Sequence, residues 1–301
     1  MRYVAAVFLG CVIGGVPAAE AGQKVDFDAR YTKLHAVEQV AIRFPESKRD
    51  ALISDQYRWL FHRFMEPRTL KKLSSDDLRF LFKAASMAAF YTVDKIYAND
   101  LRHVAAELEM RNAATNEQRV KLFHVLVQLR DFVEAKALLE KHPELEVEAL
   151  PRIPPDFGSA QTVAFDATDG ADELKSLAFD VSKGVHLVVI SHPLCSFSRN
   201  AVAALEADPE FASVFSQRTI WLAPVDGRLH LKEIREWNIQ HPQAHIVQAR
   251  HESDWPMLNE WATPQFYAIR DGAVIAHVTG WPKEGRKVEL AELLKRLSTA
   301  D

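Results

Sequence analysis

Cysteine is nearly absent from this sequence: its 301 residues include two, Cys11 and Cys195. Cys11 lies in an apolar stretch that follows the charged start Met1-Arg2 and precedes Ala19-Glu20-Ala21. A short charged start, a short apolar run and small residues two positions apart predict a signal peptide over residues 1–21 that is removed on export. Cys195 is then the one cysteine left, which excludes an internal disulfide and indicates a free thiol or pairing with another molecule.

Long apolar runs and blocks of basic charge are also lacking beyond the N-terminus. No later stretch approaches the length of a membrane-spanning helix, so we expect no membrane span in the mature chain. A net charge of −4 without a basic block argues against nucleic acid as a partner. Leu9-Gly10-Cys11 resembles a lipoprotein signal, but the apolar run continues past Cys11. We therefore expect a periplasmic or secreted protein.

Residues 31–150 are predicted to form an all-helical domain. Apolar residues recur at helical spacing from Ser54 to Met65, and Pro67 is expected to stop that helix. Ser74-Ser75-Asp76-Asp77 and Thr115-Asn116-Glu117-Gln118 are typical helix starts, because short polar and acidic side chains satisfy the free N–H groups there.

A further helix is expected from Asp94 to Arg111, and the stretch from Arg119 to His142 resembles a helix-turn-helix unit of the tetratricopeptide kind. Asp131-Phe132 marks the turn of this unit. No fixed period recurs along the domain, so a short helical solenoid and a plain helical bundle both stay open.

Prolines separate this half from the next. Pro151, Pro154 and Pro155 favour a stiff, extended connection, and residues 151–160 are predicted to be a linker. Over residues 161–301 strands alternate with helices, which is typical of an α/β domain. The expected strands are Thr162–Phe165, Val185–Ser191, Thr219–Val225, His245–Ala249, Gln265–Arg270 and Ala273–Thr279, and the expected helices are Cys195–Glu206, Leu229–Trp237 and Val288–Leu297.

The order of elements in the second half is similar to that of the thioredoxin-like superfamily. A buried strand leads into Cys195-Ser196-Phe197-Ser198 at a helix start, and Thr263-Pro264 precedes a hairpin and a last helix. Ser198 stands in place of the usual second cysteine, and Val189 and Leu194 replace a buried acid and a tryptophan of that family. The fold class expected is multidomain: an all-α N-terminal domain followed by an α/β thioredoxin-like domain.

Cys195 is the candidate nucleophile. A thiol at a helix N-terminus feels the partial positive charge of the free N–H groups, which favours the reactive thiolate. His192 and Arg199 are expected to add positive charge if they point toward the sulfur. Ser198 is a candidate donor of a hydrogen bond to the thiolate, or else a residue that only caps or packs in the first helical turn.

The resemblance also implies a substrate groove. It implies that Pro264 is cis and faces the thiol, and that the backbone of Thr263 pairs with an extended substrate. Trp255 and Trp261 precede this loop and are expected to line the groove, whereas the other tryptophans of the domain are expected in the core.

A single thiol restricts the reactions that are available. A mixed disulfide at Cys195 must be released by an external thiol or by a thiol of the client, so we expect monothiol exchange or isomerase-like action on exported protein clients. No cofactor is expected. Metal binding is not expected either, because His192, His241, His245 and His251 lack the close spacing of zinc ligands.

Two other functions stay open. One is a non-catalytic binding or assembly factor that uses the groove and the helical domain to hold a protein partner, and it predicts that Cys195 is dispensable. The other is glutathione-dependent transfer, for which Thr263-Pro264 is the one supporting feature.

Overall fold

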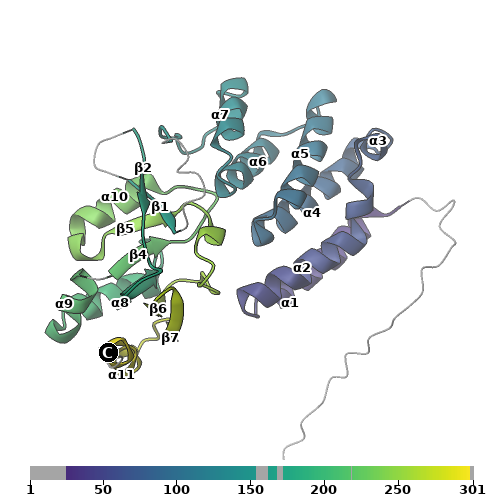
Figure 1. Ribbon diagram of the computed structural model, residues 1–301. Coiled ribbons are helices and arrows are strands. Elements are labelled where there is room, and N and C mark those ends of the chain that lie inside the picture. Colours follow the sequence, from purple (N-terminus) through teal and green to yellow (C-terminus); the bar gives the residue numbers. More distant parts are fainter. Residues whose placement is uncertain (1–24, 154–161, 168–171, 218, 299–301) are drawn as a thin grey trace, which may run out of the picture.

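The computed structural model describes residues 25–153, 162–167, 172–217 and 219–298. The expected signal peptide and residues 154–160 of the expected linker lie outside this part of the chain. Within it, a helical N-terminal half is followed by a mixed α/β half (Figure 1). None of the helices in the described residues combines the length and apolar character that a membrane span requires.

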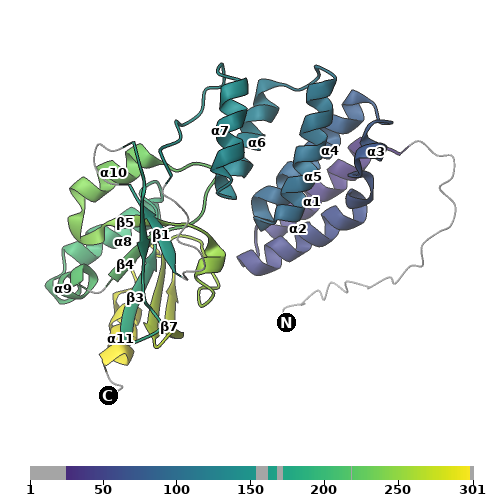
Figure 2. The ribbon, with the colours of Figure 1, turned by 45° about the horizontal axis from the view of Figure 1, so that its top comes forward.

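The helical half is built from helices that pack on one another in pairs, α1 with α2, α4 with α5 and α6 with α7 (Figure 2). Their bounds are α1 (Phe27–Ala41), α2 (Glu46–Leu60), α3 (Pro67–Leu70), α4 (Ser75–Thr92), α5 (Lys95–Met110), α6 (Asn116–Gln128) and α7 (Phe132–Lys141).

Local capping accounts for most of these helix starts. Ser74 caps α4 as expected, through a reciprocal capping box with Asp77, and Thr115 forms the capping box that its sequence predicts. Asp94 and Asp131 cap α5 and α7. The expected stop at Pro67 is wrong: α2 ends at Leu60, and Pro67 is the first residue of α3. Proline is favoured there because the N–H that it lacks would have no partner in the first turn.

The α/β half is a seven-stranded sheet in the order β2-β1-β5-β4-β3-β6-β7. Strands β3, β4 and β5 are parallel, and the remaining neighbours are antiparallel. The strands are β1 (Val163–Asp166), β2 (Lys175–Ala178), β3 (Val185–Ile190), β4 (Thr219–Ala223), β5 (Ile246–Ala249), β6 (Gln265–Arg270) and β7 (Ala273–Thr279). The helices are α8 (Ser196–Glu206), α9 (Pro209–Gln217), α10 (Leu231–Gln240) and α11 (Lys287–Ser298).

Alternation along the strands divides the sheet into two buried faces. Leu187, Val189 and Phe266 face a core shared with α8, α9, α10 and α11. Val188 and Tyr267 face the other way, against residues of the segment between β5 and β6. The helices of this half therefore pack on one face of β3, and a loop segment packs on the opposite face.

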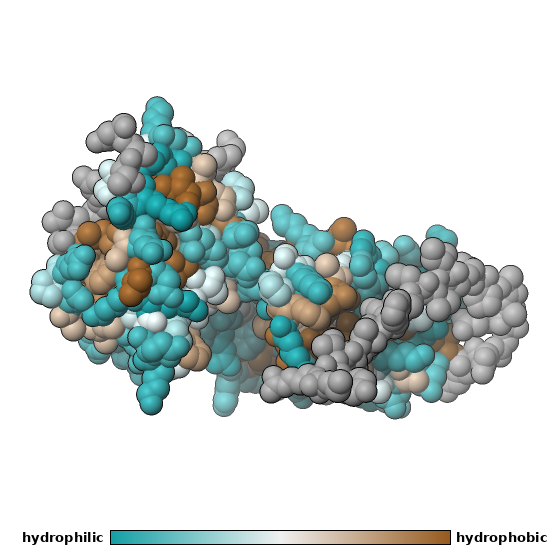
Figure 3. Space-filling view, turned by 90° about the horizontal axis from the view of Figure 1, so that it is seen from below, coloured by the Kyte–Doolittle hydropathy of each residue, from teal (hydrophilic) through white to brown (hydrophobic). Residues whose placement is uncertain are grey.

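Helix α6 joins the cores of the two halves. Phe123 and Leu126 pack in the core between the sheet and α8, α9, α10 and α11. Val125 and Leu129 belong instead to the core of the helical half. The molecule seen from below is elongated, with a mostly hydrophilic surface interrupted by apolar areas (Figure 3).

Polar contacts fix the two halves further. The guanidinium of Arg130, in the turn before α7, donates to the carbonyl oxygens of Ala249 and Arg250 at 2.8 and 3.0 Å. At the far end of the helical half, the Glu46 carboxylate accepts from the Trp261 backbone N–H at 2.5 Å. The halves thus touch both next to the connection and at α2.

The segment between β4 and α10 is held by two features of the helical half. The Glu148 carboxylate accepts from the backbone N–H groups of Leu229, His230 and Leu231 at 2.8, 3.0 and 2.8 Å. Gly227 lies so close to α6 that a Cβ atom there would be 3.0 Å from the Cβ of His124. A larger residue would require α6 to shift by a few tenths of an ångström, so the close approach of the two backbones favours glycine at this point.

Candidate functional site

The thiol of Cys195 lies at the N-terminal end of α8, just after β3. Cys195 is the N-cap residue and is extended, and no side chain caps this helix. A short turn carries the chain from the strand to the helix, with the Cys195 N–H donating to the carbonyl oxygen of His192 at 3.0 Å. The first N–H groups of α8 are therefore available to the sulfur, which is half-buried.

Strand pairing brings the Thr263-Pro264 loop to the same place. Ile190 at the end of β3 pairs with Gln265 at the start of β6, which positions the residues before β6 beside the start of α8. The Thr263–Pro264 peptide bond is cis. In its neutral form the Cys195 thiol donates to the carbonyl oxygen of Thr263, with Sγ and the oxygen 3.4 Å apart.

The surroundings of the sulfur favour the thiolate. Burial by itself raises the pKa of the Cys195 thiol, but hydrogen bonds from the side chain of Thr263, from the N–H and side chain of Ser198 and from the N–H of Phe197 more than offset it. The net result is a pKa below the ordinary value. Ser198 is fully buried, and its Oγ also accepts from the His192 N–H at 3.4 Å.

His192 and Arg199 make their polar contacts with the turn before α8. Burial, reinforced by the charge of His230, lowers the pKa of His192 to about 4, so its ring is neutral at pH 7. Its Nδ1 accepts from the Leu194 N–H at 3.2 Å, and Arg199 donates to the carbonyl oxygen of Pro193 at 2.9 Å. The positive charge expected from His192 is thus absent at neutral pH, and both side chains stabilise the turn that carries the thiol.

The expectation that Trp255 and Trp261 line an open groove is wrong. Trp255 is 0% exposed, packs in the core on the loop side of the sheet, and donates from Nε1 to the carbonyl oxygen of Val163. Trp261 lies in the same core and is nearly as buried. Burying an indole of this size contributes more to stability than leaving it in water, and here the two rings pack on the face of the sheet opposite α8, α9, α10 and α11.

Two residues that the sequence reasoning did not assign to a groove provide apolar surface beside the thiol. Leu194 and Phe197 immediately flank the start of α8, and their side chains are 53% and 55% exposed. The signal available in the sequence was two large apolar residues within the polar segment around Cys195. Exposed apolar side chains that gather around a reactive group provide a surface for a peptide.

A second histidine, also missed in the sequence, lies against His192. The rings of His192 and His230 meet edge to face with their centroids 5.0 Å apart. His230 Nε2 lies 3.5 Å from a carboxylate oxygen of Asp226, and its hydrogen bond with that carboxylate raises the pKa of His230. Of the two touching rings, one is therefore held neutral and the other favours its charged form.

Two other histidines that were considered as metal ligands, His241 and His245, each pair with a different carboxylate. His241 pairs with Glu206 at 3.0 Å and His245 with Asp166 at 2.9 Å. Within the described part of the chain, no three His, Cys, Asp or Glu side chains are grouped as a metal ion would require.

The geometry thus provides one half-buried thiol of lowered pKa, at an uncapped helix end, beside a cis-proline loop and two exposed apolar side chains. Comparison with known proteins found no match among family models, curated proteins or solved structures.

Proposed function

We propose that this protein is exported and carries out monothiol exchange on the thiols or disulfides of protein clients, through Cys195 on a thioredoxin-like domain. The observation that carries the proposal is the position of Cys195, at the uncapped start of α8 and 3.4 Å from the Thr263 carbonyl oxygen. The order of β3, the thiol, the cis Thr263–Pro264 bond, the β6–β7 hairpin and α11 supports the thioredoxin-like assignment.

The exchange step involves the client disulfide and the thiolate. Cys195 Sγ attacks one sulfur of the client disulfide, a new S–S bond forms, and the other client sulfur leaves as a thiolate. A second thiol, from the client or from a small external thiol, then attacks the mixed disulfide and restores the Cys195 thiolate. No net oxidation accompanies this pair of steps when the attacking thiol belongs to the same client, so the outcome is rearrangement of client disulfides.

The local surface suits such a substrate. Leu194 and Phe197, which precede and follow Cys195 in the chain, offer exposed apolar contacts. The hydrogen bonds of Ser198 stabilise the thiolate both before the attack and when it leaves the mixed disulfide.

Trapping in the native host tests the proposal. Cells are quenched with acid and an alkylating reagent, and the protein is followed on non-reducing gels for the wild type, Cys195→Ala and the matched control Ser196→Ala. We expect adducts with defined exported proteins in the wild type and in Ser196→Ala, and none in Cys195→Ala.

The opposite result would favour the binding function. If Cys195 stays free under oxidising conditions and Cys195→Ala supports growth as the wild type does, thiol chemistry is excluded as the role. The protein would then act as an assembly factor that holds its partner without covalent bonding.

A further inference from the structure

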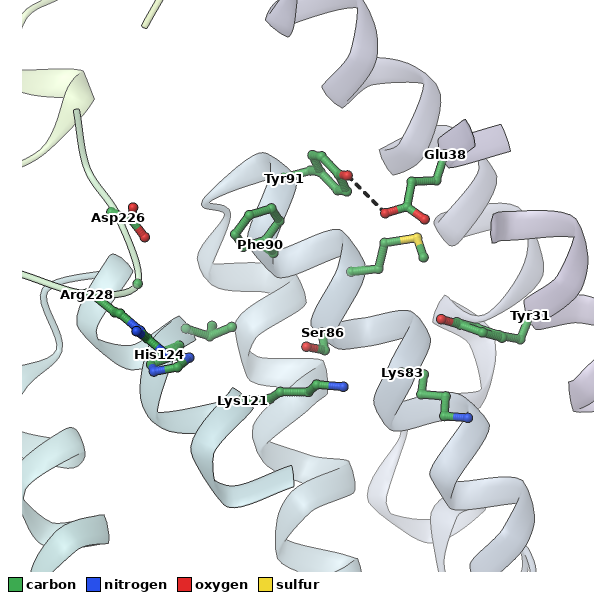
Figure 4. Close-up of a pocket in the computed structure, with 13 residues that line it drawn as sticks. Tyr31, Glu38, Lys83, Ser86, Phe90, Tyr91, Lys121, His124, Asp226 and Arg228 are labelled. Atoms are coloured by element: carbon green, nitrogen blue, oxygen red, sulfur yellow. Dashed lines mark hydrogen bonds between the residues drawn. The ribbon is translucent and has the colours of Figure 1, made fainter. Parts of the chain in front are cut away.

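A cleft of about 410 Å³ lies between the two halves, within the range of volumes of ligand sites. Helices α1, α4 and α6 line it from the helical side, and the segment between β4 and α10 lines it from the other side (Figure 4). Gly227, packed against His124, sets the separation of the two sides. The cleft is thus a fixed part of the interface.

The side chains that line the cleft include more cations than carboxylates. Lys83, Lys121 and Arg228 line it together with two carboxylates, Glu38 and Asp226. Glu38 accepts from the Tyr91 hydroxyl at 2.9 Å and pairs with His35 at 2.7 Å, and Asp226 pairs with His230. Both acids already have partners within the protein.

The cations are available to a ligand. Among the described residues, neither Lys83 nor Arg228 has a carboxylate within 4.0 Å. The Lys83 ammonium lies over the rings of Tyr31 and Phe80, at 5.7 and 5.4 Å from their centroids. Lys121 pairs with Glu117 at 2.8 Å, but both side chains are exposed, and a pair of this kind contributes little and exchanges easily.

The cleft also offers apolar contacts. Tyr31 on α1, Met87 and Phe90 on α4 and Val125 on α6 lie among the polar residues, and Phe90 is 52% exposed. Surfaces that run across stacked helices suit extended chains. A segment lying across α1, α4 and α6 would meet both apolar and cationic side chains.

One residue that lines the cleft, Asp226, is linked to the thiol site through contacts within the protein. Asp226 lines the cleft and pairs with His230, whose ring touches His192, and the carbonyl oxygen of His192 accepts from the Cys195 N–H. The lining of the cleft and the turn that carries the thiol are therefore joined by a continuous series of contacts.

We propose that this cleft binds an extended acidic segment of the client, in which carboxylates alternate with aromatic or aliphatic side chains. The proposal rests on the proposed function for the identity of the ligand as a client protein. Lys83, Lys121 and Arg228 bind the carboxylates, and Tyr31, Met87 and Phe90 contact the apolar side chains.

Binding of cysteine-free peptides to the full-length Cys195→Ala protein tests this assignment without thiol exchange. The probe is a fluorescent eight-residue peptide of alternating Glu and Phe, compared with one of alternating Lys and Phe, by anisotropy at low and high salt. We expect binding of the acidic peptide alone, weakened by salt, since its affinity depends on charge. The double variant Lys83→Gln/Arg228→Gln should bind about tenfold more weakly, and Lys136→Gln on the exposed face of α7 should bind normally.

Three results would overturn the proposal. The first is equal binding of the two peptides, and the second is unchanged affinity in a double variant whose thermal melting is preserved. The third is full competition by free glutamate at a concentration equal to that at which the peptide binds. A second variant, Tyr31→Ala, serves if the double variant does not fold, and unchanged affinity in it also overturns the proposal. The trapping experiment is independent of these measurements. Peptide binding without adducts at Cys195 would preserve the acidic-segment site and exclude thiol exchange, whereas adducts without peptide binding would do the reverse.

Discussion

The two halves of the molecule satisfy their helix N-termini in different ways. In the helical half, α1, α4, α5, α6 and α7 are each capped by a side chain of the residue just before them, and the uncapped α2 and α3 begin at or next to a proline instead. In the α/β half, α8 and α10 have no such cap. The N–H groups at the start of α10 are satisfied by Glu148 from the other half, and those of α8 are available to Cys195.

This difference shows which helix start has backbone N–H groups that can interact with a reactive side chain. A capped end is electrostatically satisfied and offers nothing to a ligand or a thiolate. At α10 the end is used to join the halves, and at α8 it is left to the sulfur. Three predictions test the contrast.

The largest effect is expected from Glu148. Glu148→Ala leaves three backbone N–H groups of the α10 start without their acceptor, and it also removes a contact between the halves. We expect the free energy of unfolding to fall by about 2 kcal/mol, because this change combines the loss of a cap with the loss of charge-assisted hydrogen bonds. Chemical denaturation measures it.

Two comparators sharpen that result. Asp94→Ala removes a local cap in the helical half and should cost about 1 kcal/mol. Glu146→Ala changes an exposed acid in the same connection and should cost less than about 0.5 kcal/mol. Equal effects of Glu148→Ala and Glu146→Ala would contradict a capping role for Glu148.

The two touching histidines should respond to pH in opposite directions. The pKa of His192 is about 4 in the folded protein and near 6.5 in the unfolded chain, so the unfolded state binds more protons between these values and stability falls as the pH falls. The raised pKa of His230 contributes stability below pH 6.5 that is lost as the pH rises through its folded value.

Denaturation at pH 7 and pH 5 checks these signs. The loss of stability between the two values should be smaller in His192→Gln than in the wild type, by about 1 kcal/mol. In His230→Gln the loss should be greater than in the wild type. Parallel pH profiles for all three proteins would show that the rings are not held in these protonation states.

The smallest effect is expected at the open end of α8. Ser198→Ala removes one hydrogen bond to the thiolate and should raise the pKa of Cys195, slowing alkylation at pH 7 a few-fold. The pH dependence of the alkylation rate measures the shift. Ser196→Ala, at an exposed position of the same turn, should leave the profile unchanged, and identical profiles for both variants would exclude Ser198 from the site.

The sequence predicted those parts of the fold that depend on nearby residues. The bounds of β6 and β7, the cap at Ser74 and the capping box at Thr115 agree with the expectation, because turn and cap signals act over a few positions. Helix α9 and strand β2 were missed. Strand β2 has four residues, none of them buried, so its pattern carries little hydrophobic signal.

Contacts between distant residues explain the remaining differences. Cys195 and Thr263 were placed together through a resemblance, and their 3.4 Å contact agrees with it. Glu148 contacts residues more than 80 positions away, and the ring contact of His230 with His192 and the cleft between the halves also join distant parts of the chain, which no local pattern encodes. Trp255 was misplaced because its position near the loop said nothing about which way its ring faces.

Helix α6, which both cores share, determines how the two halves unfold. Since its opposite sides belong to two cores, dividing the chain at the prolines would strip Phe123 and Leu126 from the sheet, and dividing it before α6 would strip Val125 and Leu129 from the helices. Neither piece would keep a complete interior. The two halves are therefore expected to melt together, as a single cooperative transition, although their architectures differ.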